Sequence, residues 1–257
     1  MIQFNGQNAF KEIHYNGHDI KYAYGGCSGD LVWEKSSPTP SYKLKAEYNG
    51  VSYELPWDGN PILTSGETLS LYNLVPSPTY GNYVNFTVGN NVTELGDGCF
   101  NINKGLYIGD IHIPSSVKTI GTRAIYNANN TANGKIICEA FDGTLVKREN
   151  FTICSVEETL DLSGCYFENN TLYFCLYTTH GMKNLILPSS MTSIRYAPYD
   201  CSELENVTIL AITPPTLGTS AFYQCPALTN IYVPAQSVSA YASAWPQYSS
   251  KIKPIPT

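Results

Sequence analysis

A short unit recurs along this chain: an alternating strand, a residue that stops it, and a second short apolar set. The clearest copy is Lys183–Ile194, in which Leu185 and Leu187 alternate with their neighbours until Pro188 ends the strand. Related copies are Asn85–Gly96, Asp110–Gly121, Asn206–Gly218 and Thr229–Pro234. Repetition of this kind indicates a solenoid, in which each unit buries its apolar side chains against the next.

The repeats have a measurable period. The last inward residue of each strand recurs at spacings of 22 to 25 residues, at Val88, Ile113, Cys138, Leu162, Leu187, Ile209 and Val233. Cys138 and Leu162 lie where the motif has decayed, but Gly134–Cys138 and Glu158–Leu162 still alternate as strands do. The period therefore predicts seven coils.

These motifs resemble the BspA-type leucine-rich repeat. Asp110–Gly121 has its Pro-Ser stop and Ile-Gly ending, and Thr213–Pro226 with Ile231–Val238 looks like the usual C-terminal end of that family. The resemblance runs from Asn82 to Ile255 and departs from the pattern at 128–172. It implies a mainly β fold: a leucine-rich-repeat solenoid of about seven coils, preceded by small N-terminal β-hairpin units.

Residues 1–34 are predicted to form a small β unit. Ile13–Tyr15 and Ile20–Tyr24 alternate on either side of Asn16-Gly17, which predicts a hairpin, and Leu31–Trp33 predicts a third strand. A unit of this size has too small a hydrophobic core to be stable by itself. We therefore expect it to anchor the chain on another protein, with residues 35–41 as a linker stiffened by two prolines.

Residues 42–80 are predicted to form a hairpin that caps the solenoid. The segment alternates on both sides of Asn49-Gly50, with Leu44 on one face of the first strand and Lys43 on the other. The open edge of a first coil needs such a cover.

The solenoid itself is predicted over residues 81–236, and residues 237–257 should form its C-terminal cap. Tyr241 and Trp245 are expected to lie over the last coil, because the end of a stack otherwise exposes apolar side chains.

Composition narrows the possible partners. Charged residues make up 14% of the chain and the net charge is −6, without a run of Lys and Arg, which argues against nucleic acid. The sequence contains no stretch near the roughly 18 apolar residues of a membrane span, so membrane insertion is not expected. Met1–Gly6 lacks the basic and apolar regions of a secretory signal. We expect either that the protein crosses no membrane by itself or that a signal was removed.

The eight cysteines are expected to be small buried residues of the stacked coils. Cys99 takes the position that Ala124 and Ala221 hold in their coils, and Cys201 and Cys225 each follow that column by four residues. A Cys201–Cys225 disulfide formed on oxidation stays open as an alternative, since adjacent coils are close. Zinc would favour a Cys-x-x-Cys pair, which the sequence lacks.

The sequence contains no recognisable pattern for catalysis, and no catalytic, cofactor-binding or metal-binding residue is predicted. His14 and His18 flank the Asn16-Gly17 turn and leave open a metal pair across that hairpin, without a third ligand. Asp58–Asn60 resembles the start of a calcium loop but lacks the closing Glu, so a plain turn is expected. The chain is not expected to be an enzyme.

Stacking the coils should align two outward columns on the strand face. One column is Asn85, Asp110, Lys135, Thr159, Asn184, Asn206 and Asn230. The other is Thr87, His112, Ile137, Asp161, Ile186, Thr208 and Tyr232. Amides beside an occasional aromatic ring suit a glycan or a protein, and a plain solvated face is the alternative. The candidate recognition face is Asn85, Asp110, His112, Lys135, Asp161, Asn184, Asn206, Asn230 and Tyr232.

Three functions compete. Lys11–Lys21 with Leu31–Glu34 resembles N-terminal hairpins of phage appendage proteins. This implies a virion protein of a tailed phage of gut bacteria, made in the host cytoplasm. It would be held in an oligomeric assembly by other virion proteins through residues 1–34, and would attach to a host-surface or mucosal glycan or protein. The alternative is a bacterial surface adhesin whose signal was removed. A glycan-active enzyme is the third function, and the sequence offers no residue in its support.

Overall fold

The chain forms two units, residues 1–41 and 42–257. The computed structural model describes residues 12–15, 18–24, 31–33, 42–76, 78, 82–101, 107–127 and 134–256. The predicted linker at 35–41 and the Asn16-Gly17 turn lie outside the described residues.

The first unit contains the three predicted strands. These are β1 (Glu12–Tyr15), β2 (His18–Tyr24) and β3 (Leu31–Trp33), which pair antiparallel in the order β1-β2-β3. The register places His14 opposite Asp19 and Tyr15 opposite His18. The side chains of His14 and His18, and with them the possible metal pair, lie outside the described part of the chain.

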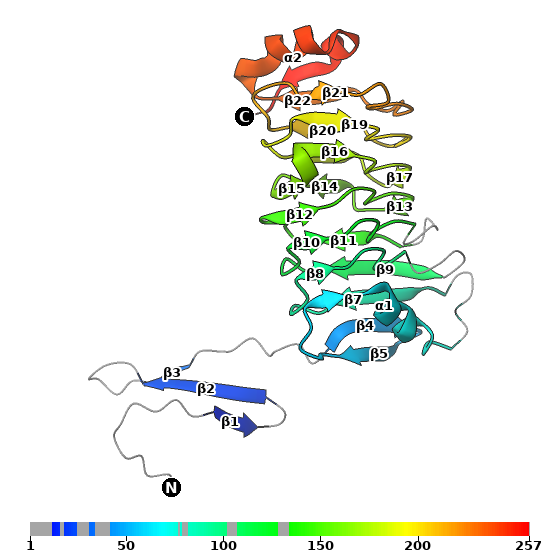
Figure 1. Cartoon of the computed structure of the whole chain (residues 1–257), viewed down its shortest axis with the longest axis vertical. Helices are drawn as coiled ribbons and strands as arrows, with labels where there is room; N and C mark the ends of the chain where they lie inside the picture. Colours follow the sequence, from blue (N-terminus) through cyan, green and yellow to red (C-terminus); the bar gives the residue numbers. More distant parts are fainter. Residues whose placement is uncertain are drawn as a thin grey trace. The chain divides into compact units, whose positions relative to one another are not determined.

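The second unit is a stack of repeats whose strands pair in parallel with those of the next repeat (Figure 1). One sheet contains β7 (Val84–Val88), β9 (Ile108–Ile113) and β11 (Ile136–Cys138). A second sheet contains β6 (Ile62–Leu63), β8 (Glu94–Leu95), β10 (Thr119–Ile120), β12 (Thr144–Val146) and β15 (Cys165–Phe167).

Three further sheets continue the stack toward the C-terminus. The first is formed by β14 (Thr159–Asp161), β18 (Asn184–Leu187), β20 (Asn206–Ile209), β22 (Asn230–Val233) and β23 (Ile252–Pro254). The second is formed by β16 (Thr171–Tyr173), β19 (Ser193–Arg195) and β21 (Thr216–Leu217). The third is the pair β13 (Cys154–Ser155) and β17 (Thr179–His180).

The predicted inward column forms the core along one side of the stack. Six of its seven members are at most 1% exposed: Val88, Ile113, Leu162, Leu187, Ile209 and Val233. One continuous apolar cluster reaches from Leu44 to Ile252. The inward assignment is therefore confirmed at these six positions.

Cys138, the seventh member, is only half-buried, but it pairs in register with the inward Ile113 and packs against the core. Ile136 bridges to Val156, 20 residues on, so the 24-residue step from Cys138 to Leu162 does not describe the pairing here. The sheets that contain β11 and β14 are separate, and so are those that contain β15 and β16. Residues 139–170 therefore form an irregular coil that includes both breaks, and the period is interrupted where the motif had decayed.

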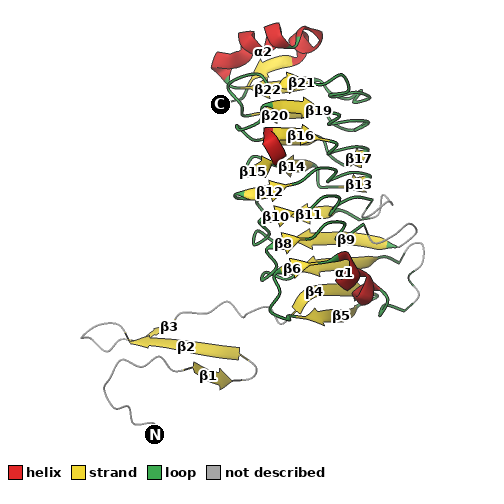
Figure 2. Cartoon of the chain, in the orientation of Figure 1, coloured by secondary structure: helices red, strands yellow, loops and turns green. Residues whose placement is uncertain are grey.

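The N-terminal end of the stack is covered by a hairpin of β4 (Tyr42–Tyr48) and β5 (Val51–Pro56), with β4 antiparallel to β7. A helix that the strand pattern does not predict, α1 (Ser65–Tyr72), follows the hairpin (Figure 2). Its signal is the capping box Thr64-x-x-Glu67, in which the Thr64 side chain accepts from the Glu67 N–H and the Glu67 carboxylate accepts from the Thr64 N–H.

Lys43 is expected on the outer face of β4, but it is completely buried. The pairing of β4 with β5 shifts register between Tyr42 and Leu44, and such bulges re-aim the side chain beside them. The Lys43 Nζ donates to Glu67 Oε1 at 2.6 Å. Burial opposes ionisation of Glu67, yet hydrogen bonds from Lys43 and Thr64 hold its pKa below the ordinary value.

The C-terminal end is covered by η2 (Ala235–Ser237), α2 (Val238–Ala244) and η3 (Pro246–Lys251). Tyr241 and Trp245 are buried beneath this cover. The Tyr241 hydroxyl donates to the Ala211 carbonyl at 2.7 Å, and the Trp245 indole N–H donates to the Pro215 carbonyl at 3.0 Å. The chain then adds β23 beside β22, so the last repeat also has a parallel neighbour.

We predict that Leu187→Asp destabilises the repeat unit by about 4 kcal/mol or more, because it places an unpaired carboxylate in a dry column. Thr208→Asp, on the outward face of the neighbouring strand, should change the melting temperature little. Melts followed by circular dichroism make the comparison. Equal melting temperatures would refute the inward and outward assignment.

We predict that Lys43→Met lowers stability by about 1–3 kcal/mol at neutral pH, because Glu67 loses its cation. A carboxyl whose folded pKa is depressed stabilises the fold above its unfolded pKa, near 4.5, and this contribution disappears as the pH falls through the lower folded value. The difference in free energy of unfolding between the wild type and Lys43→Met should therefore decrease toward zero in acid. The control is Lys45→Met, whose lysine is in a more exposed pair with Glu47. A gap that does not vary with pH would contradict the assignment.

Candidate functional site

The predicted recognition face lies outward as expected but is divided in two. Asn85, His112, Lys135 and Asp161 are exposed, and the other members are half-buried: Asp110, Asn184, Asn206, Asn230 and Tyr232. Strands β7 and β9 hold the members up to His112, Lys135 directly precedes β11, and β14, β18, β20 and β22 hold the rest. Because β11 does not pair with β14, the structure does not join these residues into one continuous face.

Hydrogen bonds along the first column occupy most of its amide groups. Asn184 Nδ2 donates to Thr159 Oγ1 at 3.2 Å, Asn206 Nδ2 to Asn184 Oδ1 at 2.9 Å, and Asn230 Nδ2 to Asn206 Oδ1 at 2.7 Å. Lys253 Nζ donates to the last oxygen of this series. We call Thr159, Asn184, Asn206 and Asn230 the amide ladder. Its polar atoms bind one another and hold neighbouring repeats in register.

The N-terminal half of the column uses its side chains in the same way. Asn85 Oδ1 accepts from the Asp110 N–H at 2.8 Å, and Asp110 Oδ1 accepts from the Lys135 N–H at 2.8 Å. Each side chain thus satisfies a backbone donor of the following repeat. These contacts favour a structural role for this column over direct recognition.

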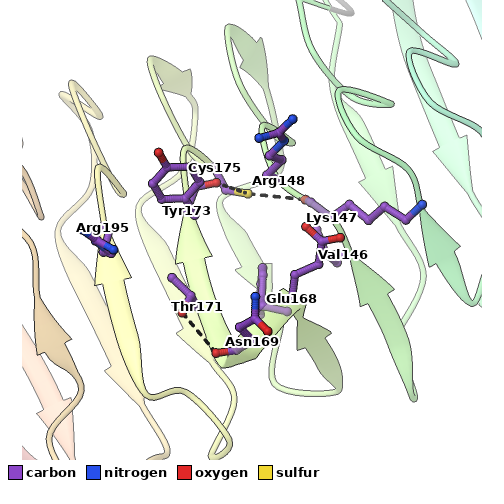
Figure 3. A pocket seen from close by; sticks show the side chains of 10 residues that line it. Val146, Lys147, Arg148, Glu168, Asn169, Thr171, Tyr173, Cys175 and Arg195 are labelled. Carbon is purple, nitrogen blue, oxygen red and sulfur yellow. Dashed lines mark hydrogen bonds between the residues drawn. The ribbon is translucent and has the colours of Figure 1, made fainter.

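A pocket of about 440 Å³ lies at the irregular coil, outside the predicted face (Figure 3). We call it the basic pocket. Its lining comes from β12, β15, η1 (Glu168–Asn170), β16 and β19: Val146, Lys147, Arg148, Phe167, Glu168, Asn169, Thr171, Tyr173, Cys175 and Arg195.

The basic pocket opens where two sheets end. Phe167 pairs with Val146, and β15 is the last strand of its sheet. The chain then turns through η1, with Asn169 and Asn170 at positive φ of 53° and 52°, a conformation that Asn tolerates better than most residues. Strand β16 begins a new sheet and pairs with β19. The edges of β15 and β16 therefore both lie beside the pocket.

The lining of the pocket is cationic. Lys147, Arg148 and Arg195 contribute to it, against the single carboxylate of Glu168. Among the described residues, neither Lys147 nor Arg195 has a carboxylate within ion-pair distance, and Arg148 reaches Glu149 only at 3.8 Å. Glu149 also pairs with Arg123. In a chain of net charge −6, this is an uncompensated positive region.

Aromatic rings continue from the pocket onto the surface. Tyr173 packs edge-on against Phe174 with centroids 4.7 Å apart, and Phe174 stacks on Tyr196 at 4.7 Å with an interplanar angle of 11°. Phe174 and Tyr196 are each 38% exposed. We call Tyr173, Phe174 and Tyr196 the aromatic cluster.

A second, smaller pocket of about 220 Å³ lies at the other break, between β11 and β14. Its carboxylates are Glu139, Glu157 and Asp161. Glu139 accepts from the Ser115 N–H and hydroxyl, and Asp161 accepts from the Ser163 N–H. Throughout the part of the chain that the structure describes, no three His, Cys, Asp or Glu side chains are grouped to hold a metal ion.

The described cysteines are free thiols, and all except Cys138 are buried. Burial raises the pKa of Cys99 and Cys165 to about 12 and that of Cys175 to about 11, which suppresses the reactive thiolate. A hydrogen bond with Cys225, together with burial, raises the pKa of Cys201 well above its ordinary value. The two thiols are thus neighbours, as the spacing predicts, and are not joined by a disulfide.

Sequence comparison identifies the repeats. The family model for the BspA type leucine rich repeat region matches six copies, over residues 79–155 and 170–255, which is more than half of the chain. The unmatched residues 156–169 include Phe167, Glu168 and Asn169 of the basic pocket. No curated protein matches the chain. Every helix among the described residues is too short or too polar to span a membrane.

We predict that Asn206→Ala lowers stability by about 1–2 kcal/mol, because it removes two half-buried hydrogen bonds of the amide ladder. The exposed His112→Ala should leave the melting temperature unchanged. Thermal melts of the two variants provide the measurement. A stable Asn206→Ala protein would mean that the ladder does not hold the repeats together.

Proposed function

The chain belongs to the BspA-type leucine-rich repeat family, and from this premise we propose that it is a non-enzymatic attachment protein. Its repeats form a solenoid of about seven coils, and the sides of the solenoid bind a host-surface or mucosal glycan or protein. Repeat stacks offer broad, rigid surfaces of the kind that such binding uses.

The observation that carries this proposal is the division of the chain into a small unit and a large, capped one. Tyr241 and Trp245 of the C-terminal cover are buried, and so are Leu44 and Ala46 of the N-terminal hairpin. A repeat unit closed at both ends leaves its sides available for a ligand. The three short strands of residues 1–34 suit docking on a partner better than independent folding.

We further propose that the protein is a virion component of a tailed phage of gut bacteria. Residues 1–34 attach it to other virion proteins in an oligomeric assembly, and the solenoid is displayed. The support is the resemblance of Lys11–Lys21 and Leu31–Glu34 to appendage hairpins, together with the three-stranded sheet of that segment. The alternative assignment is a bacterial surface adhesin, and the experiment below distinguishes it from a virion protein.

We predict that residues 42–257 fold as a soluble, cooperative unit but are not incorporated into phage particles. Residues 1–34 fused to an unrelated folded carrier should be incorporated in place of the full chain, because the anchor lies in that segment. Mass spectrometry and immunoblots of gradient-purified particles measure incorporation.

Full occupancy of particles by the 42–257 fragment would refute the anchor. Absence of the full-length chain from particles, with its recovery on the surface of bacterial cells, would replace the virion assignment by the adhesin.

A further inference from the structure

We propose that the basic pocket binds a sugar residue that carries a carboxylate, within an acidic glycan. This inference rests on the proposed attachment function and names the chemical class of its ligand. It places recognition at the irregular coil and not on the amide ladder.

The charge of the pocket is the first argument. Among the described residues, Arg195 has no carboxylate within ion-pair distance, and Arg148 has one long ion-pair contact, with Glu149 at 3.8 Å. Arg148 is 57% exposed. These two arginines beside the pocket can bind an anion, because a guanidinium matches the planar geometry of a carboxylate with two parallel hydrogen bonds.

The position of these arginines is the second argument. Tyr173 and Arg195 are direct partners in the register of β16 and β19, and Arg148 comes from the turn of chain that follows β12. Figure 3 shows the Tyr173 ring between the two arginines, whereas the Lys147 side chain extends away from the ring. Arg148 and Arg195 therefore lie on either side of an aromatic ring of the pocket lining. Lys147 contributes only to the positive electrostatic potential around the pocket.

The aromatic cluster indicates a sugar and not a bare anion. Phe174 and Tyr196 adopt positive φ of 49° and 53°, and Arg123 and Glu149 have the same conformation in preceding repeats, at 56° and 63°. The backbone position therefore does not require an aromatic residue. Exposed rings offer apolar surface to the C–H groups of a sugar, while Glu168, Asn169 and Thr171 offer polar groups to its hydroxyls.

The interruption of the repeat is the third argument. In the neighbouring repeats the strands pair from one repeat to the next, but here β15 and β16 each end a sheet. The lining of the pocket includes the residues 167–169 that the family model does not match.

Calorimetry with the full-length protein tests the inference. The probes are a galacturonic acid oligosaccharide, its carboxyl-reduced galactose counterpart and free inorganic sulfate. We expect the acidic oligosaccharide to bind, the reduced one to bind at least about tenfold more weakly, and salt to weaken the acidic ligand. Equal binding of both oligosaccharides, or tight binding of sulfate alone, would overturn the assignment to a carboxylate sugar.

Paired variants locate the site. Arg148→Ala with Arg195→Ala should reduce affinity for the acidic oligosaccharide about tenfold or more. The control, Lys118→Ala with Lys183→Ala, removes the same charge from exposed lysines elsewhere and should stay within about twofold of wild type. Phe174→Ser should weaken both oligosaccharides alike. Circular dichroism verifies that each variant is folded. Equal losses in the arginine and lysine pairs would show a diffuse charge effect and refute the pocket.

Cell binding distinguishes the proposed attachment function from the proposed pocket. If the wild type and the Arg148→Ala, Arg195→Ala variant bind host cells equally well, the attachment function is supported and the proposal that the pocket binds the ligand is refuted. Protein that binds the acidic oligosaccharide through these arginines but binds neither cells nor mucus supports the pocket and refutes attachment to a host surface.

Discussion

Backbone pairing between residues one repeat apart is the constraint on which the second unit depends. Each strand is too short to be stable alone, and it acquires partners only from the repeats before and after it. The first and last repeats lack one neighbour, which is why β4 pairs antiparallel with β7 and β23 adds to β22. The same constraint explains the buried Tyr241 and Trp245, whose polar atoms bind carbonyl groups that the last regular repeats leave free.

Polar side chains then fix the register that apolar packing alone would leave adjustable. The buried Asn150 accepts from the Ile125 N–H at 2.9 Å and donates to the carbonyls of Gly121 and Lys147 at 2.7 and 2.9 Å. The amide ladder does the same on the outer face. A shift of one residue would leave these groups unsatisfied in places that water reaches poorly, and each such group costs about 1–3 kcal/mol. Polar residues of this stack are thus part of its architecture.

At the irregular coil, in contrast, the repeat pattern is lost and a candidate binding site is present. Where the repeat is regular, outward polar atoms are committed to neighbouring repeats, and a ligand finds few of them free. Where the repeat fails, β15 and β16 end their sheets, and Arg148, Arg195 and Tyr173 line the pocket there. A site in a repeat protein is therefore best sought where the pattern is lost, because the stacking that uses up polar groups stops there.

The sequence by itself determined the family, the mainly β character and the inward column at six of seven positions, because apolar side chains must recur wherever strands stack. It indicated the strands of residues 1–34 and located the stretch where the motif decays. Tertiary structure alone decided that the stack is interrupted after β11, where Ile136 bridges to Val156 and β11 does not pair with β14. It also decided that Lys43 is buried, through a bulge and the carboxylate of Glu67. Tyr173 and Arg195 are neighbours because β16 pairs with β19, and Arg148 lines the same pocket where β15 ends its sheet. No local pattern encodes the proximity of residues that far apart in the chain.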